Sequence, residues 1–70
     1  MLGIRLHRSS EVSLKRQIYT ALRERIVQGS LQPGEGLPSS RQLARELQVS
    51  RNTVNEAFDM LSVEGYVVSR

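Results

Sequence analysis

The sequence predicts a mainly α-helical domain of three helices, two of which form a helix-turn-helix. Apolar residues recur at three- and four-residue spacing in three separate segments, which is the period of a helix with one face on a core. Serine precedes the second and third segments, where it can cap the first turn of a helix. Only Gln48 and Val49 separate the end of the second segment from the serine that opens the third, so the chain must turn sharply there.

The first helix is predicted from Leu14 to Gln28, with Gly29 as its C-terminal stop. Glycine just past the last periodic residue accepts the left-handed conformation that ends a helix. Tyr19 has an apolar ring with a polar tip and is therefore expected at the edge of the core. The inward face consists of residues at four-residue steps: Leu14, Ile18, Leu22 and Ile26.

The second helix is predicted to begin after Ser39, whose hydroxyl can accept a free amide of the first turn. Gln42, three positions later, can reach back to the amide of the serine. Where two helices cross closely after a tight turn, the residue midway along the first must be small, and Ala44 has this position. The inward residues are Leu43, Ala44 and Leu47.

The third helix is predicted at residues 51–64, between an N-cap at Ser50 and a stop at Gly65. At about 100° per residue, its outward face begins with polar side chains in the first turn and a half. The N-terminal residues of a recognition helix enter the major groove of DNA, where arginine pairs with guanine and asparagine with adenine. A solvated helix face is the alternative for an isolated helix, but the preceding helix and turn favour DNA binding. The outward residues are Arg51, Asn52 and Asn55.

Length and composition limit the remaining functional classes. Seventy residues make one small domain, residues 1–70, with a modest core. The chain lacks cysteine and has no apolar run near the length of a membrane span or a signal peptide, so we expect a cytoplasmic protein without membrane contact. The net charge is +3 and every basic residue except Lys15 is arginine, a composition that permits binding to a polyanion without establishing it.

No catalytic or metal site can be assembled from these residue types. The single histidine, His7, lies near the N-terminus without a second histidine at ligand spacing, and no cysteine is present. A catalytic triad, a thiolate nucleophile and the common zinc sites are therefore not expected. Upstream of the first helix, Ile4 and Leu6 alternate with polar residues, as in a short strand or an extended arm that could cross to another domain.

The run LPSSRQLARELQVSRNTVNEAFDMLSVEGY, residues 37–66, resembles the helix-turn-helix of the GntR family of bacterial transcription regulators. The stretch 49–54, the aromatic Phe58 and the stretch 64–66 are most similar to the MocR branch. The resemblance implies a winged helix-turn-helix with three helices and a minimal β wing that binds double-stranded DNA. One departure is Gln48, where such turns often carry glycine; a left-handed glutamine there is strained by up to about 2 kcal/mol.

The resemblance also implies roles for residues beyond the three outward ones. Arg41 is expected to contact the DNA backbone, while Ser50 and Thr53 lie with Arg51, Asn52 and Asn55 on or in the major groove. Residues 66–70 have the composition of a strand, which cannot satisfy its own backbone without a partner. They are therefore expected to begin the wing, with Arg70 near the backbone or the minor groove, and residues 1–70 to be a fragment.

The complete protein is expected, by the same resemblance, to carry a C-terminal effector domain after residue 70. In the MocR branch this domain has the fold of a pyridoxal-phosphate aminotransferase, senses an effector and makes a homodimer. No cofactor is expected in residues 1–70, and the isolated domain is expected to be monomeric. Two alternatives remain at this point: a winged helix used for protein contact, or an accessory domain of a pyridoxal-phosphate enzyme.

Overall fold

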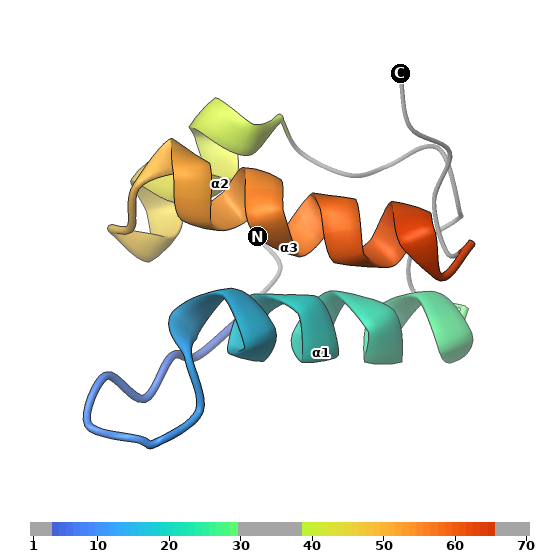
Figure 1. The fold of residues 1–70 in the computed structure, drawn as a ribbon, viewed down its shortest axis with the longest axis horizontal. Helices are drawn as coiled ribbons and strands as arrows, with labels where there is room; N and C mark the ends of the chain where they lie inside the picture. The colour runs from blue at the N-terminus through green and yellow to red at the C-terminus, as the bar shows by residue number, and fades with distance from the viewer. Residues whose placement is uncertain (1–3, 30–38, 66–70) are drawn as a thin grey trace.

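The computed structural model describes residues 4–29 and 39–65 and contains three helices in that part of the chain. They are α1 (Leu14–Val27), α2 (Ser40–Leu47) and α3 (Arg51–Val63), shown in Figure 1. The prediction of three helices is confirmed, and α1 and α3 each end one residue earlier than expected. The described residues contain no strand; the predicted wing strand at 66–70 lies outside them.

Serine caps the start of each helix, as predicted for Ser39 and Ser50. The Oγ atoms of Ser13, Ser39 and Ser50 each accept the backbone amide three positions later, at 3.1 to 3.3 Å. Each such cap satisfies an amide with no partner inside the helix and contributes on the order of 1 kcal/mol. At the other ends, Gly29 and Gly65 follow the C-caps of α1 and α3 with φ of 85° and 83°, a conformation that glycine adopts without a steric penalty.

The helix α3 is the central element, since it packs on both α1 and α2. Figure 1 shows α3 packed over α1, with α2 near the N-terminal end of α3. Each predicted apolar stripe contributes to one shared core. Tyr19, expected at the edge, is instead 2% exposed, because its ring is packed among these side chains. The core residues are Ile18, Tyr19, Leu22, Ile26, Leu43, Ala44, Val54, Ala57 and Leu61.

The N-terminal arm, residues 4–13, contains no strand and turns at residues 8–12, where the Ser10 amide donates to the His7 carbonyl at 3.2 Å. Ile4 and Leu6 are partly buried against the core of this same domain. The side chain of Gln17 holds the arm: its Oε1 accepts the His7 amide at 2.8 Å, and its Nε2 donates to the carbonyls of His7 and Val12 at 3.0 and 2.8 Å. The arm is thus part of the domain, and the alternation of Ile4 and Leu6 reflects packing against the core rather than a β-strand.

Substituting Ala44 by leucine should destabilise the domain by about 1 to 3 kcal/mol. Ala44 is 5% exposed on α2, so a larger side chain must force α2 away from the core. Thermal unfolding followed by circular dichroism should show a melting temperature lower by roughly 4 to 20 °C. Glu46→Leu, which adds the same side chain on the exposed face of α2, is the control, and equal melting temperatures for the two variants would contradict the packing.

Candidate nucleic-acid interface

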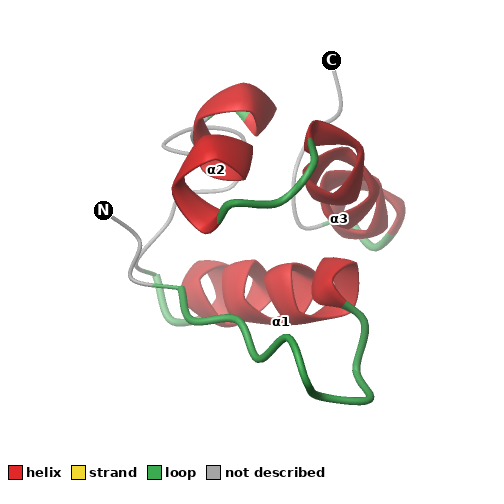
Figure 2. Cartoon of the chain, turned by 90° about the vertical axis from the view of Figure 1, so that its left-hand side faces the viewer, coloured by secondary structure: helices red, strands yellow, loops and turns green. Residues whose placement is uncertain are grey.

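The turn between α2 and α3 consists of Gln48, Val49 and Ser50. Gln48 has φ 59° and ψ 47°, so the left-handed glutamine inferred for this position is confirmed. The amide of Val49 donates to the carbonyl of Ala44 at 3.0 Å, and the Val49 side chain packs against the core. Figure 2 shows the short connection running directly from α2 into α3. This geometry sets the direction in which α3 leaves α2.

The first turn and a half of α3 presents Arg51, Asn52 and Asn55 to solvent, as predicted. The opposite face is anchored by Val54 and Ala57, both 0% exposed. Within the described part of the chain, none of the three outward side chains has a hydrogen bond or ion pair. Their donors and acceptors are therefore available to an external ligand such as the edge of a base pair.

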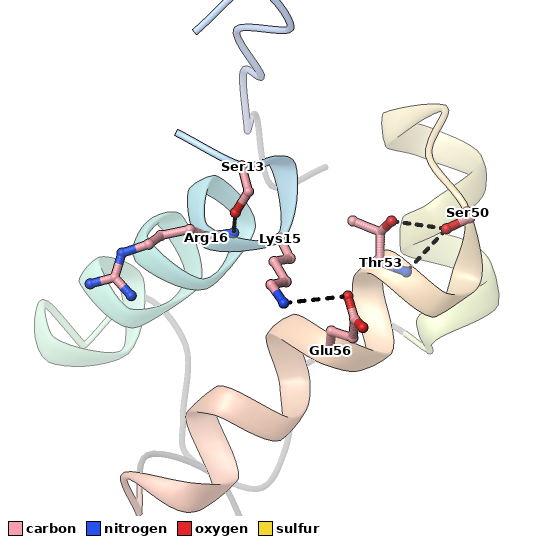
Figure 3. A network of polar contacts seen from close by, with 6 residues as sticks. All are labelled: Ser13, Lys15, Arg16, Ser50, Thr53 and Glu56. Carbon is pink, nitrogen blue, oxygen red and sulfur yellow. Dashed lines mark hydrogen bonds and ion pairs between the residues drawn. The ribbon is translucent and has the colours of Figure 1, made fainter. Parts of the chain in front are cut away.

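Ser50 and Thr53 form a hydroxyl pair at the start of α3 (Figure 3). The Ser50 Oγ accepts the Thr53 amide at 3.1 Å and lies 2.9 Å from the Thr53 Oγ1. Either hydroxyl can be the donor between them, and in both arrangements one hydroxyl hydrogen remains for another acceptor. Thr53 is half-buried beside the exposed Ser50, so the pair can donate one hydrogen bond to a phosphate oxygen without leaving its capping geometry.

Two arginines extend the basic surface onto α2. Arg41 is exposed in the first turn of α2, and Arg45 is exposed one turn later, so both lie on one side of the helix. Arg45 was not among the predicted DNA-binding residues, although its four-residue spacing from Arg41 is visible in the sequence. Arg70, the remaining predicted DNA-binding residue, lies outside the described residues.

Acidic side chains bound the exposed polar face of α3. Asp59 is exposed and continues the four-residue row that begins with Arg51 and Asn55. Glu56 forms an ion pair with Lys15 of α1, with 3.8 Å between the Oε1 and Nζ atoms (Figure 3). Because carboxylates repel phosphates, only the N-terminal part of α3 is suited to a nucleic acid.

The C-terminal end of α3 is tied to α1 by Tyr19. Its hydroxyl donates to Glu64 Oε1, while the guanidinium carbons of Arg16 and Arg23 lie 5.7 and 5.3 Å from the ring centroid. The hydrogen bond to Glu64, and secondarily burial, raises the pKa of Tyr19, with Arg23 opposing the shift. Because the pKa of Tyr19 is raised in the folded chain, its hydrogen bond to Glu64 contributes fully to stability at pH values below the unfolded-state pKa. That contribution is lost as the pH rises through the folded-state pKa.

The described residues carry neither a membrane span nor a metal cluster. None of the helices in residues 4–29 and 39–65 combines the length and hydrophobicity that crossing a membrane requires. Within the same ranges, no group of three or more histidine, aspartate or glutamate side chains is placed to hold a metal ion.

The structure combines a short capped helix, a turn with one left-handed residue, and a second helix that exposes arginine and asparagine in its first turns. These features define the helix-turn-helix class of DNA-binding domains. Residues 14–70 match the profile described as "Bacterial regulatory proteins, gntR family". The chain belongs to the GntR family, as the DNA-binding domain of a transcription regulator.

Similar proteins agree with this assignment. The chain is 45% identical over 65 residues to the probable rhizopine catabolism regulatory protein MocR of Rhizobium meliloti, covering 93% of the chain and 13% of the relative. It is 40% identical over 65 residues to the uncharacterized HTH-type transcriptional regulator YdeL of Bacillus subtilis, covering 93% and 14%. The structure of YtrA from Sulfolobus acidocaldarius, a GntR-family transcription factor, superposes with a TM-score of 0.88 at 39% identity, covering 96% of this chain and 71% of that chain.

These findings confirm the resemblance to GntR regulators with MocR among the relatives, and they disfavour the protein-contact alternative. The structural neighbour also agrees with the expected winged-helix class, although the wing residues themselves lie outside the described ranges. The chain spans about a seventh of the length of the two curated relatives, so the activity of the whole protein is a separate question.

Proposed function

We propose that this domain recognises a specific duplex DNA sequence by inserting the N-terminal half of α3 into the major groove. The observation that carries the proposal is the set of three exposed polar side chains on α3, Arg51, Asn52 and Asn55, without partners in the described part of the chain. Their helix is fixed at one end by the turn and at the other by the bond between Tyr19 and Glu64. A rigid scaffold of this kind fixes the register in which side chains meet base edges.

The side chains divide by chemistry into base readers and phosphate contacts. Arg51 suits the two acceptors of guanine, and Asn52 and Asn55 suit the donor and acceptor of adenine. The hydroxyl pair of Ser50 and Thr53 has one hydrogen available for a phosphate. Outside α3, Arg41 on α2 and Arg70, which lies outside the described residues, supply positive charge to the DNA backbone.

Arg51→Ala should lower affinity for the preferred duplex by about 1 to 3 kcal/mol, or roughly 5- to 150-fold. The probe is the duplex that the wild-type chain enriches from a random library, and the comparison is a random duplex of equal length. Arg51 is exposed, so the fold should survive its loss. Base reading by Arg51 predicts that the ratio of the two affinities falls.

Arg5→Ala is the matched control for Arg51→Ala. It removes the same charge from an exposed arginine of the N-terminal arm and should change both affinities in the same proportion. If Arg51→Ala kept the wild-type ratio between the selected and random duplexes, its assignment as a base reader would be wrong.

For the complete protein we propose a homodimeric cytoplasmic regulator whose larger remaining part binds pyridoxal phosphate. The relatives MocR and YdeL are about seven times longer than the matched segment, which leaves room for such a domain. The similarity to MocR supports the branch in which that domain has the aminotransferase fold. Residues 1–70 would then bind DNA without a cofactor or catalytic activity of their own, whether or not the larger part retains enzymatic chemistry.

A further inference from the structure

Arg8 of the N-terminal arm reaches the turn of the helix-turn-helix, 39 and 40 residues away in the sequence. Its Nη2 donates to the carbonyl oxygens of Leu47 at 2.8 Å and Gln48 at 2.9 Å. Leu47 ends α2 and Gln48 is its C-cap. Carbonyls at this end of a helix lack intrahelical partners and carry the negative end of the helix dipole, so the guanidinium satisfies both groups with a matching charge.

The two bonds fall on the strained part of the turn. Gln48 has a left-handed backbone, which costs free energy in any residue with a Cβ atom. A charged donor that holds the carbonyls on both sides of the Gln48 Cα restricts the peptide orientations that the turn can adopt. Since the turn directs α3, these bonds also restrict the orientation of the recognition helix.

Arg8 is itself held in place by its neighbours on the arm. The backbone of His7 makes two hydrogen bonds with the Gln17 side chain of α1, and Ile4 and Leu6 pack against the core. The guanidinium therefore links α1 to the turn rather than hanging from a loose tail. This link comes from a segment that precedes residues 14–70, the part of the chain that matches the family profile.

We propose that Arg8 is a positioning residue for DNA recognition: it fixes the left-handed turn at Gln48 and thereby the orientation of α3. The proposal rests on the proposed function only in that α3 is taken to read the groove. A positioning role for Arg8 differs from a direct phosphate contact. A phosphate contact would strengthen binding to every duplex alike and would add to the salt dependence of binding.

Arg8→Ala should weaken binding to the duplex selected by the wild-type chain by about 3- to 10-fold, as expected for the loss of one or two exposed charge-assisted hydrogen bonds. Binding to a random duplex should fall less. The slope of log affinity against log salt should stay at the wild-type value, whereas loss of a phosphate contact would lower its magnitude by about 0.9. Arg5→Ala, on the same arm, is the control for loss of charge.

A rescue variant separates positioning from direct contact. Glycine adopts the left-handed conformation without strain, so adding Gln48→Gly to Arg8→Ala should recover most of the lost affinity. A lost phosphate contact cannot be restored in this way. A lower salt slope in Arg8→Ala together with no rescue by Gln48→Gly would overturn the proposal, as would wild-type affinity for the selected duplex in Arg8→Ala.

Hydrogen exchange tests the same idea without DNA. The Val49 amide, bonded to Ala44 O across the turn, should exchange about 3- to 10-fold faster in Arg8→Ala, while the amides of the buried part of α1 keep their wild-type rates. Exchange of Val49 at the wild-type rate would overturn the role of Arg8. If the wild-type chain enriches no duplex at all, the proposed function fails, and faster Val49 exchange still supports Arg8 as the residue that fixes the turn.

Discussion

Leu22→Ala is expected to lower the free energy of unfolding by about 2 to 5 kcal/mol. Leu22 is 0% exposed in the middle of α1, where it contributes to the core shared with α3. A domain of this size has a total stability of roughly 3 to 10 kcal/mol, so the variant should be partly or wholly unfolded at physiological temperature. Chemical denaturation followed by circular dichroism measures the change.

Val63→Ala is the matched control for Leu22→Ala, because it also shortens an aliphatic side chain in a helix. Val63 is 87% exposed at the end of α3, so its truncation should change the free energy of unfolding by no more than about 0.5 kcal/mol. Equal stability of Leu22→Ala and the wild-type chain would mean that Leu22 does not lie in the core.

Fusion of this chain to an unrelated dimerisation module should raise its affinity for a two-half-site duplex by about 100-fold or more. A single domain carries one recognition helix, whereas a dimer brings the second helix to the second half-site as an intramolecular event. Among the described residues, the exposed large apolar side chains are Val12, Val27 and Val63, on different elements. We therefore expect the bare chain to remain monomeric at micromolar concentration.

Sedimentation tests whether the bare chain is monomeric. Binding titrations on one duplex compare the affinity of the fusion with that of the bare chain. The control fusion carries a variant of the same module that cannot dimerise, and a second control duplex has only one half-site. The gain should require both dimerisation and two half-sites. A stable dimer of the bare chain would reveal an interface within these residues and contradict the expectation.

Much of the fold follows from short-range rules in the sequence. The serine caps at 39 and 50 and the glycines at 29 and 65 occur where expected, because a cap depends only on residues within one helical turn. The outward position of Arg51, Asn52 and Asn55 follows equally from the apolar stripe on the opposite face of α3. Their roles on DNA, and those of Ser50, Thr53, Arg41 and Arg70, remain predictions.

Other features depend on residues that are distant in the sequence, and no local pattern carries that information. The ring of Tyr19 can be buried because Glu64, 45 residues later, accepts its hydroxyl hydrogen, and a buried hydroxyl requires such a partner. Arg8 and Ile4 belong to the domain because helix packing brings the α2–α3 turn and the core within their reach. The sequence alone therefore determined the helices and their outward faces, through capping and periodicity. The tertiary structure decided how the arm, the turn and the two ends of α3 are held, since those contacts exist only when the helices pack together.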